Sequence, residues 1–198
     1  TGAVVSNDTI DINYNDGAAL QVSHRDVTGT GITPANLTLS ESDPYDFGLI
    51  ANNGTITHAF TITNSGASSA TGMGESGLAA PFGFLGGGYP GTGGDCGGTL
   101  AGGGATCTIV VEFAPTSLGT PSDTIVIDYN DGAVAQTATR DVQGTSGAPA
   151  NLALDGGATY DYLIHAVSSS TSHVFTVSNS GAVSATAMAD GGGLASPY

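Results

Sequence analysis

Residues 123–133 read DTIVIDYNDGA, and residues 8–18 read DTIDINYNDGA. In both stretches two Ile residues and a Tyr occupy alternate positions, which is the period of a β-strand with one buried face. The Asn-Asp-Gly that follows is a strong signal for a tight hairpin, because a primed turn needs positive φ, which these residues tolerate. We therefore predict two hairpin turns, formed by Asn15, Asp16 and Gly17 and by Asn130, Asp131 and Gly132.

The two stretches belong to a longer internal repeat. Residue 8 corresponds to residue 123, an offset of 115, and the same offset aligns RDV at 25–27 with 140–142 and PANL at 34–37 with 149–152. This period matches a whole small domain and exceeds the repeats of solenoids. We predict the C-terminal part of one repeat in 1–32, a complete repeat in 33–147 and the N-terminal part of the next in 148–198. Either further repeats or another subunit would then complete the partial copies.

Alternating apolar residues mark further strands in the complete repeat. Residues 55–64 alternate with Phe60 and Ile62 on one face, and Cys107, Ile109 and Val111 share one parity. A unit of this length with about seven strands indicates an immunoglobulin-like sandwich. No stretch has a sustained helical period, and none approaches the roughly 20 apolar residues of a membrane helix. The predicted fold class is all-β, with tandem immunoglobulin-like β-sandwich repeats of about 115 residues.

The charge is strongly one-sided, with 17 acidic residues against Arg25 and Arg140 and a formal net charge of −15. Nucleic acid and anionic membranes bind clustered Lys and Arg, so we expect neither partner and no membrane insertion. The scattered acids indicate a solubilising surface or a divalent-cation site. The Asn-Asp-Gly turns lack the ligand spacing of known calcium loops, and the weak Ca²⁺ candidates are acids near a repeat junction, namely Asp26, Asp43 and Asp46.

Two cysteines, Cys96 and Cys107, lie in one local segment. Their spacing favours a loop-closing disulfide over two free thiols, and a disulfide requires an oxidising compartment. We expect each recurring arginine, Arg25 and Arg140, to form a structural ion pair with a carboxylate, the alternative being ligand contact. His58 recurs as His173 and is interpreted as a partly buried histidine rather than a metal ligand.

The chain carries no pattern of catalytic residues. It has no Gly-x-Ser-x-Gly elbow, and the absence of lysine excludes phosphate-loop and Schiff-base chemistry. We therefore expect no enzyme activity and no cofactor, structural Ca²⁺ being the one alternative.

Residues 96–101, which read CGGTLA, and 107–119, which read CTIVVEFAPTSLG, carry a family resemblance. Together with FTITNSG at 60–66 they resemble the bacterial choice-of-anchor D repeats, relatives of the immunoglobulin-like ASH and HYDIN-type modules. The glycine-rich stretch 86–104 departs from that pattern because it is longer. The resemblance implies a structural role in a large secreted or surface protein, without enzyme activity.

These observations favour a structural repeat unit of an extracellular bacterial filament, stalk or giant surface protein, which provides length and stiffness. Its partners would be neighbouring copies of itself, as tandem repeats or as filament subunits joined by strand donation. The alternative is an adhesin or carbohydrate-binding module that uses the glycine-rich loop with Phe84 and Tyr89. The expected location is extracellular, at the bacterial cell surface.

Overall fold

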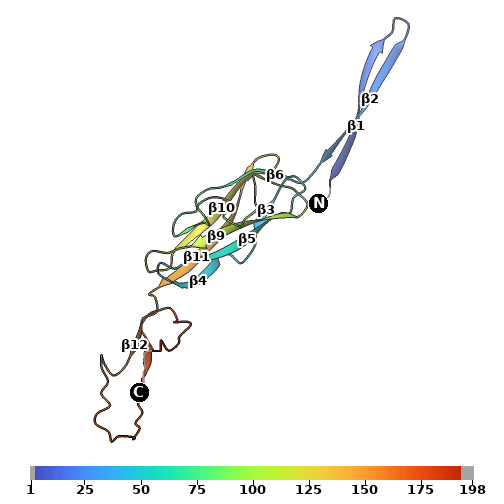
Figure 1. Cartoon of the computed structure of the whole chain (residues 1–198). Helices are drawn as coiled ribbons and strands as arrows, with labels where there is room; N and C mark the ends of the chain where they lie inside the picture. The colour runs from blue at the N-terminus through green and yellow to red at the C-terminus, as the bar shows by residue number, and fades with distance from the viewer. Residues whose placement is uncertain (1–2, 193–198) are drawn as a thin grey trace.

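The computed structural model describes residues 3–192. The chain is elongated, with a two-stranded hairpin at one end, a sandwich in the middle and residues 148–192 at the other end (Figure 1). Residues 1–2 and 193–198, which belong to the two predicted partial repeats, lie outside the described residues. The described part is built from strands and loops, and it includes no helix suited by length and apolar character to crossing a membrane.

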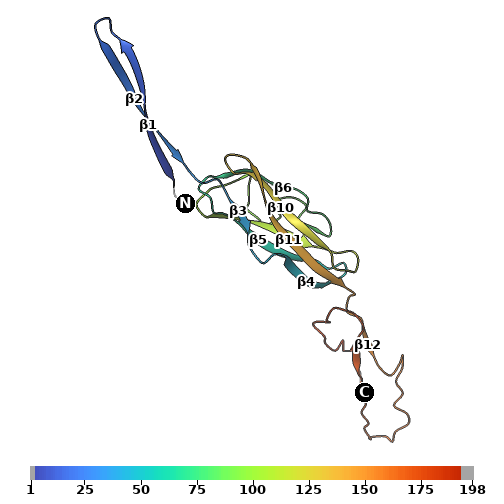
Figure 2. The same ribbon diagram turned by 180° about the vertical axis from the view of Figure 1, so that it is seen from behind.

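Residues 33–147, here called the central unit, form two packed sheets (Figure 2). The first has the order β4-β11-β10-β6-β8, with β4 (Tyr45–Ala51), β6 (Ala70–Glu75), β8 (Thr99–Leu100), β10 (Ser122–Asn130) and β11 (Ala135–Gly147). The second has the order β3-β5-β9-β7, with β3 (Leu37–Leu39), β5 (Ile56–Asn64), β7 (Phe82–Phe84) and β9 (Ala105–Phe113). The predicted all-β, immunoglobulin-like fold is confirmed.

The first part of the central unit changes sheets along its length. Strand β3 pairs antiparallel with β5 in one sheet, whereas β4 pairs parallel with β11 in the other. The β10 and β11 strands form the predicted antiparallel hairpin, with Asp123 opposite Val142. One continuous segment therefore ties the two sheets together, and it supplies an edge strand to each of them, β3 to one and β4 to the other.

The core lies between the sheets and follows the alternation read from the sequence. Its fully buried apolar side chains come mainly from β5, β9, β10 and β11, and the large ones include Phe60, Ile62, Ile109, Val111, Phe113, Ile125, Ile127 and Val142. Phe82 stacks on Phe113 with 4.8 Å between ring centroids. Each buried side chain of this size stabilises the fold by roughly 1.5–3 kcal/mol relative to an exposed one, so this double layer supplies most of the driving force.

The glycine-rich stretch 86–104 follows the outer edge of β9 instead of forming a free loop. Leu85 N–H donates to Val110 O at 3.0 Å, Val110 N–H to Pro90 O at 2.8 Å, and Asp95 N–H to Thr108 O at 3.0 Å. The Cys96–Cys107 disulfide joins this stretch covalently to β9, which confirms the predicted bond. Because exposed strand edges are templates for aggregation, the stretch shields β9 from pairing with other chains.

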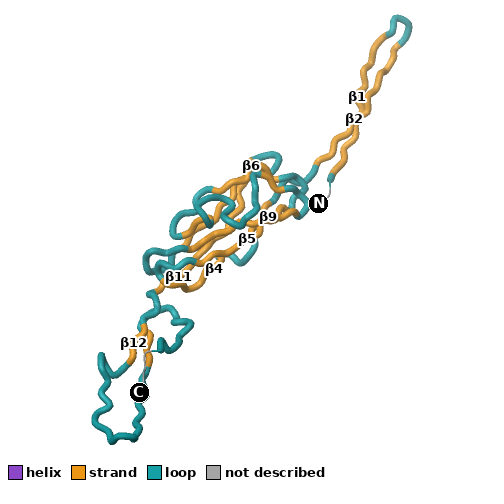
Figure 3. The backbone as a smooth tube through the Cα atoms, viewed as in Figure 1, coloured by secondary structure: helices purple, strands orange, loops and turns teal. Residues whose placement is uncertain are grey.

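The two ends of the chain repeat pieces of the central unit. The hairpin of β1 (Val4–Asn15) and β2 (Leu20–Gly31) pairs Asp8 with Val27, the register of Asp123 and Val142 shifted by 115. At the other end, β12 (Leu152–Leu154) pairs with β13 (Val177–Asn179) as β3 pairs with β5. Most of the remaining C-terminal part is loop (Figure 3). The strands at both ends therefore keep the register of their counterparts in the central unit.

Candidate functional site

The junction after the central unit has no free linker residue. Gly147 ends β11, pairs with Ala51 and accepts a hydrogen bond from Asn52 N–H at 2.8 Å. The next carbonyl, that of Ala148, accepts from Ala182 N–H at 3.0 Å and Val183 N–H at 3.2 Å, both in the C-terminal part. Gly147 is thus hydrogen-bonded to the central unit and the adjacent Ala148 to the C-terminal part, so the backbone passes directly from one part to the other.

Side chains also meet at this junction. A Cβ built on Gly147 would lie 2.9 Å from Leu49 Cδ1 and 2.9 Å from Ala182 Cβ. Leu49 belongs to β4 of the central unit, and Ala182 belongs to the segment that follows. The missing side chain at residue 147 therefore allows the two parts to pack directly against each other, which restricts bending.

A recurring hydrogen-bond cluster holds the chain where it enters each unit. In the central unit the Asn64 carboxamide oxygen accepts from Asn36 N–H at 3.0 Å and Gly66 N–H at 3.1 Å. Asn179 accepts from Asn151 at 2.9 Å and Gly181 at 3.0 Å in the same way. Sequence reasoning missed this role, although the recurring PANL and NSGA motifs were a signal for it.

The junction before the central unit is one residue longer. Thr33 O accepts from Ala67 N–H at 3.2 Å and Ser68 N–H at 3.0 Å, while Gly31 is still paired with Val4 in the hairpin. Only Ile32 lies between these two attachments, and it stands where the second junction has Gly147. Both junctions are therefore short, and the following unit anchors each of them.

The two predicted hairpin turns use their aspartates as backbone acceptors. Asp131 Oδ1 accepts from the N–H groups of Val134 and Ala133, each at 2.8 Å, and these bonds lower the pKa of Asp131. Asp16 makes the equivalent bonds with Ala19 and Ala18, which lower its pKa likewise. Gly132 has a φ of 99°, as the turn requires. The arrangement is that of a hairpin turn, with the carboxylates occupied by the backbone.

The structure does not bring the three acids proposed for Ca²⁺ together. Asp43 Oδ1 accepts from Asp141 N–H at 3.0 Å, and Asp46 accepts from Gly48 N–H at 2.8 Å and Gln143 Nε2 at 3.2 Å. Asp26 lies on the N-terminal hairpin, where it accepts from Thr9 Oγ1 at 2.9 Å. Within residues 3–192, no three His, Cys, Asp or Glu side chains are grouped to hold a metal ion.

The two recurring arginines differ in their surroundings. Arg140 Nη2 donates to Leu39 O at 2.7 Å, and Nη1 lies 3.7 Å from Asp43 Oδ1. This guanidinium therefore links β11 to the segment between β3 and β4. Arg25 has no ion pair in the described part of the chain, contrary to our expectation, because no counterpart of that segment packs on the β1–β2 hairpin.

The recurring histidines pack against aromatic rings. His58 stacks on Tyr45 with 4.2 Å between ring centroids, and its Nε2 lies 3.5 Å from Glu41 Oε1. His173 stacks on Tyr160 at 3.9 Å. The side chain of His58 is 27% exposed, so His58 is the partly buried histidine that the sequence indicated, whereas its counterpart His173 is exposed.

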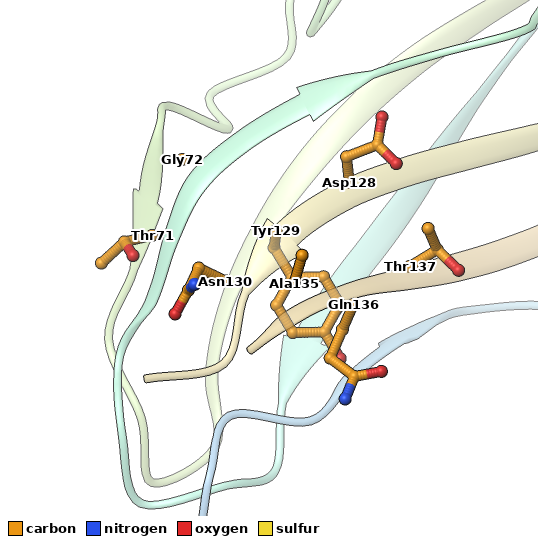
Figure 4. A pocket seen from close by; sticks show the side chains of 8 residues that line it. All are labelled: Thr71, Gly72, Asp128, Tyr129, Asn130, Ala135, Gln136 and Thr137. Atoms are coloured by element: carbon orange, nitrogen blue, oxygen red, sulfur yellow. The ribbon is translucent and has the colours of Figure 1, made fainter. Parts of the chain in front are cut away.

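Several shallow hollows lie on the surface of the described residues, and one of them lies at the ends of three strands of the first sheet. This hollow holds about 540 Å³ and lies between the ends of β6, β10 and β11 (Figure 4). Its lining includes Asp128, Asn130 and Thr137. In the glycine-rich stretch, Phe84 is buried beneath Tyr89, with 5.8 Å between ring centroids. The two aromatic residues proposed for sugar binding therefore pack on each other.

Residues 37–145, which span both sheets of the central unit, match the model of the HYDIN/CFA65/VesB-like Ig-like domain family. The chain belongs to this family. The match begins at β3 and ends inside β11, so the family unit coincides with the sandwich defined above.

Several solved structures resemble this Ig-like chain at low identity. The VesB protease of Vibrio cholerae is 20% identical with a TM-score of 0.44, over 57% of this chain and 32% of that one. A protein of unknown function from Porphyromonas gingivalis W83 is 14% identical with a TM-score of 0.43, over 73% and 66%. The ASH/PapD-like domain 7 of human CEP192 is 14% identical with a TM-score of 0.40, over 60% and 88%. The chain thus spans about a third of VesB, and no curated protein matches it.

Proposed function

We propose that the Ig-like chain is a structural unit of an extracellular bacterial filament, stalk or giant surface protein, and that it provides length and stiffness. The observation that carries this proposal is the junction at Gly147 and Ala148, where consecutive residues are hydrogen-bonded into two different parts. A junction without a free linker residue fixes the orientation of one part of the chain relative to the next, whereas a flexible linker would let that orientation vary.

The covalent chemistry supports the extracellular location. The Cys96–Cys107 disulfide persists only where the environment is oxidising. The net charge of −15 keeps such units soluble and apart from one another. The proposed role is mechanical and involves no catalysis.

The experiment measures how rigid the junction is. Spin labels are placed on Leu118→Cys in the central unit and Ala153→Cys in the C-terminal part, both exposed positions, and the distance distribution is recorded by pulsed EPR. We expect a narrow distribution that broadens when Gly-Ser-Gly is inserted between Gly147 and Ala148. The same insertion between Gly87 and Gly88 in the glycine-rich stretch is the control and should leave the distribution narrow. A starting distribution as broad as that of the junction insertion would refute the proposal.

No observation favours the adhesin alternative as a second function. Sugar stacking needs an exposed aromatic face, and Phe84 is buried against Tyr89. The tyrosine hydroxyl donates to Gly97 O at 3.4 Å, which turns it toward the chain.

A further inference from the structure

One face of the β1–β2 hairpin carries a row of uncovered apolar side chains. Ile10, Ile12, Tyr14 and Val27 are between 41% and 59% exposed there. Their counterparts 115 residues later, Ile125, Ile127, Tyr129 and Val142, are at most 7% exposed. The same pattern is therefore a core face in the central unit and a bare surface on the hairpin. Contiguous apolar surface of this kind marks an interaction site.

The central unit shows what covers such a face. There β11 pairs in parallel with β4, placing Val142 opposite Tyr45. Arg140 Nη2 donates to Leu39 O at 2.7 Å, and Leu37 N–H donates to the Tyr129 hydroxyl at 3.4 Å. Strands from the first half of a unit thus hold the last hairpin through both backbone and side-chain contacts.

The C-terminal part carries the sequence counterparts of these first-half strands with their apolar residues uncovered, of which β12 and β13 are formed as strands while residues 160–166, the counterpart of β4, are not. The uncovered apolar residues are Leu152, Leu154, Tyr160, Phe175 and Val177, all between 37% and 64% exposed. The residues that correspond to them in the central unit are Leu37, Leu39, Tyr45, Phe60 and Ile62, which are buried or half-buried. One chain therefore presents two surfaces whose counterparts in the central unit pack against each other.

We propose that the β1–β2 hairpin of one chain docks on residues 149–179 of a second copy, in the pose that β10 and β11 adopt on β3, β4 and β5. The two surfaces lie at opposite ends of the elongated chain with the sandwich between them, so they do not meet within one molecule (Figures 1 and 2). The contact is head-to-tail, and heterologous contacts of this kind that do not close produce linear chains. This docking rests on the proposed structural role and names its partner.

Specific contacts follow from the repeat. Arg25 would donate to Leu154 O as Arg140 does to Leu39 O. Arg25, which has no ion pair in the described part of the chain, would thereby gain a hydrogen-bond partner. The Tyr14 hydroxyl would accept from Leu152 N–H as Tyr129 does from Leu37 N–H. Ala158 stands where the central unit has Asp43, so that ion pair is not reproduced.

The docked unit is less complete than the central one. In one sheet it contains β1 and β2 in the places of β10 and β11, with residues 160–166, which are not a strand in the single chain, in the place of β4. In the other sheet it contains only β12 and β13, in the places of β3 and β5, without the β9 strand or the disulfide. We therefore expect a reversible contact that weakens on dilution. Because both partners are acidic and the contact is apolar, added salt should strengthen association by screening their repulsion.

Sedimentation velocity over a range of protein concentrations tests the docking. We expect the mean mass to rise from 19.3 kDa with concentration, and more steeply at high salt. Ile12→Asp on the apolar face should weaken association at least about tenfold, whereas Asn13→Asp adds the same charge on the opposite face and should not. The melting temperature of the central unit checks that this unit is folded in both variants. A mass of one chain at every concentration, or equal effects of the two variants, would overturn the proposal.

Cysteine pairing distinguishes this pose from others. A chain with Asp26→Cys is mixed with a chain carrying Ala158→Cys, since their counterparts Asp141 and Asp43 are 3.0 Å apart between N and Oδ1. The expected product is the mixed disulfide. A predominance of Asp26→Cys homodimers would show hairpin-to-hairpin pairing and reject the proposal. The EPR test of junction stiffness is carried out on dilute single chains. A flexible junction would therefore refute the proposed structural role without bearing on whether two copies associate.

Discussion

Gly144 of β11 faces the ring of Phe113 so closely that a Cβ at residue 144 would lie 2.5 Å from Cε1 of that ring. The aromatic side chain of β9 thus fills the space above a glycine of the opposite sheet. Phe113 is fully buried and also stacks on Phe82, so it has little room to move.

We expect Gly144→Ala to destabilise the central unit by about 1–3 kcal/mol through overpacking. Urea unfolding followed by circular dichroism measures the change. Gly29→Ala is the matched control, because residue 29 is the counterpart of residue 144 and a Cβ there meets nothing within 4 Å. Equal losses of stability in the two variants would show that the contact with Phe113 is not the cause.

The disulfide should stabilise the same unit by restricting the unfolded chain. Cys96 and Cys107 are separated by 11 positions, and closing a loop of this size contributes roughly 3 kcal/mol. We expect replacement of both cysteines by alanine to lower the free energy of unfolding by about that amount. Wild-type protein in strong reductant should unfold like the variant, and the variant should not respond to reductant. A wild-type protein that is insensitive to reductant would contradict this account.

The sequence predicted the elements that depend on local pattern. The alternation in residues 55–64 and 107–113 and the turns at Asp16 and Asp131 were all readable, because strand faces and tight turns are set by nearby residues. The course of the glycine-rich stretch 86–104 could not be predicted. It depends on backbone hydrogen bonds to β9, and glycines give no side-chain pattern that would indicate them.

The junction was only partly predictable. Short connections were visible in the sequence, but the role of Asn64 depends on three carbonyl groups and two N–H groups that meet only in the folded unit. The surroundings of Arg25 and Arg140 differ for the same reason. Their local sequences are alike, and the segment that packs on Arg140 has no counterpart on the hairpin.

Replacing Asn64 should therefore be costly. Its side chain is fully buried, and Asn64→Ala would leave the N–H groups of Asn36 and Gly66 without their acceptor. We expect a loss of roughly 2–4 kcal/mol in the central unit, since each unsatisfied buried group costs about 1–3 kcal/mol. Asn179→Ala removes the same local bonds in an exposed setting and should change the stability of the central unit by less than about 0.5 kcal/mol. Thermal unfolding of both variants compares the two positions directly.

The turn aspartates give the central unit a defined response to acid. Hydrogen bonds from Val134 and Ala133 lower the pKa of Asp131 in the folded state, so its stabilising contribution is fully present above the unfolded pKa of about 3.9. That contribution is lost as the pH falls through the lower, folded pKa. We therefore expect Asp131→Asn to lower the free energy of unfolding of the central unit at neutral pH. In strong acid the difference in this free energy between the variant and the wild type should become smaller.

The hairpin provides the control for this prediction. Asp16 has the same hydrogen bonds and a pKa lowered in the same direction, but its turn lies outside the central unit. Asp131 also connects to that unit through its carbonyl, which accepts from Ala35 N–H at 2.9 Å. Urea unfolding at several pH values should thus show an acid-dependent effect for Asp131→Asn and none for Asp16→Asn. A difference between Asp131→Asn and wild type that stays constant with pH would mean that the turn carboxylate does not contribute through its ionised form.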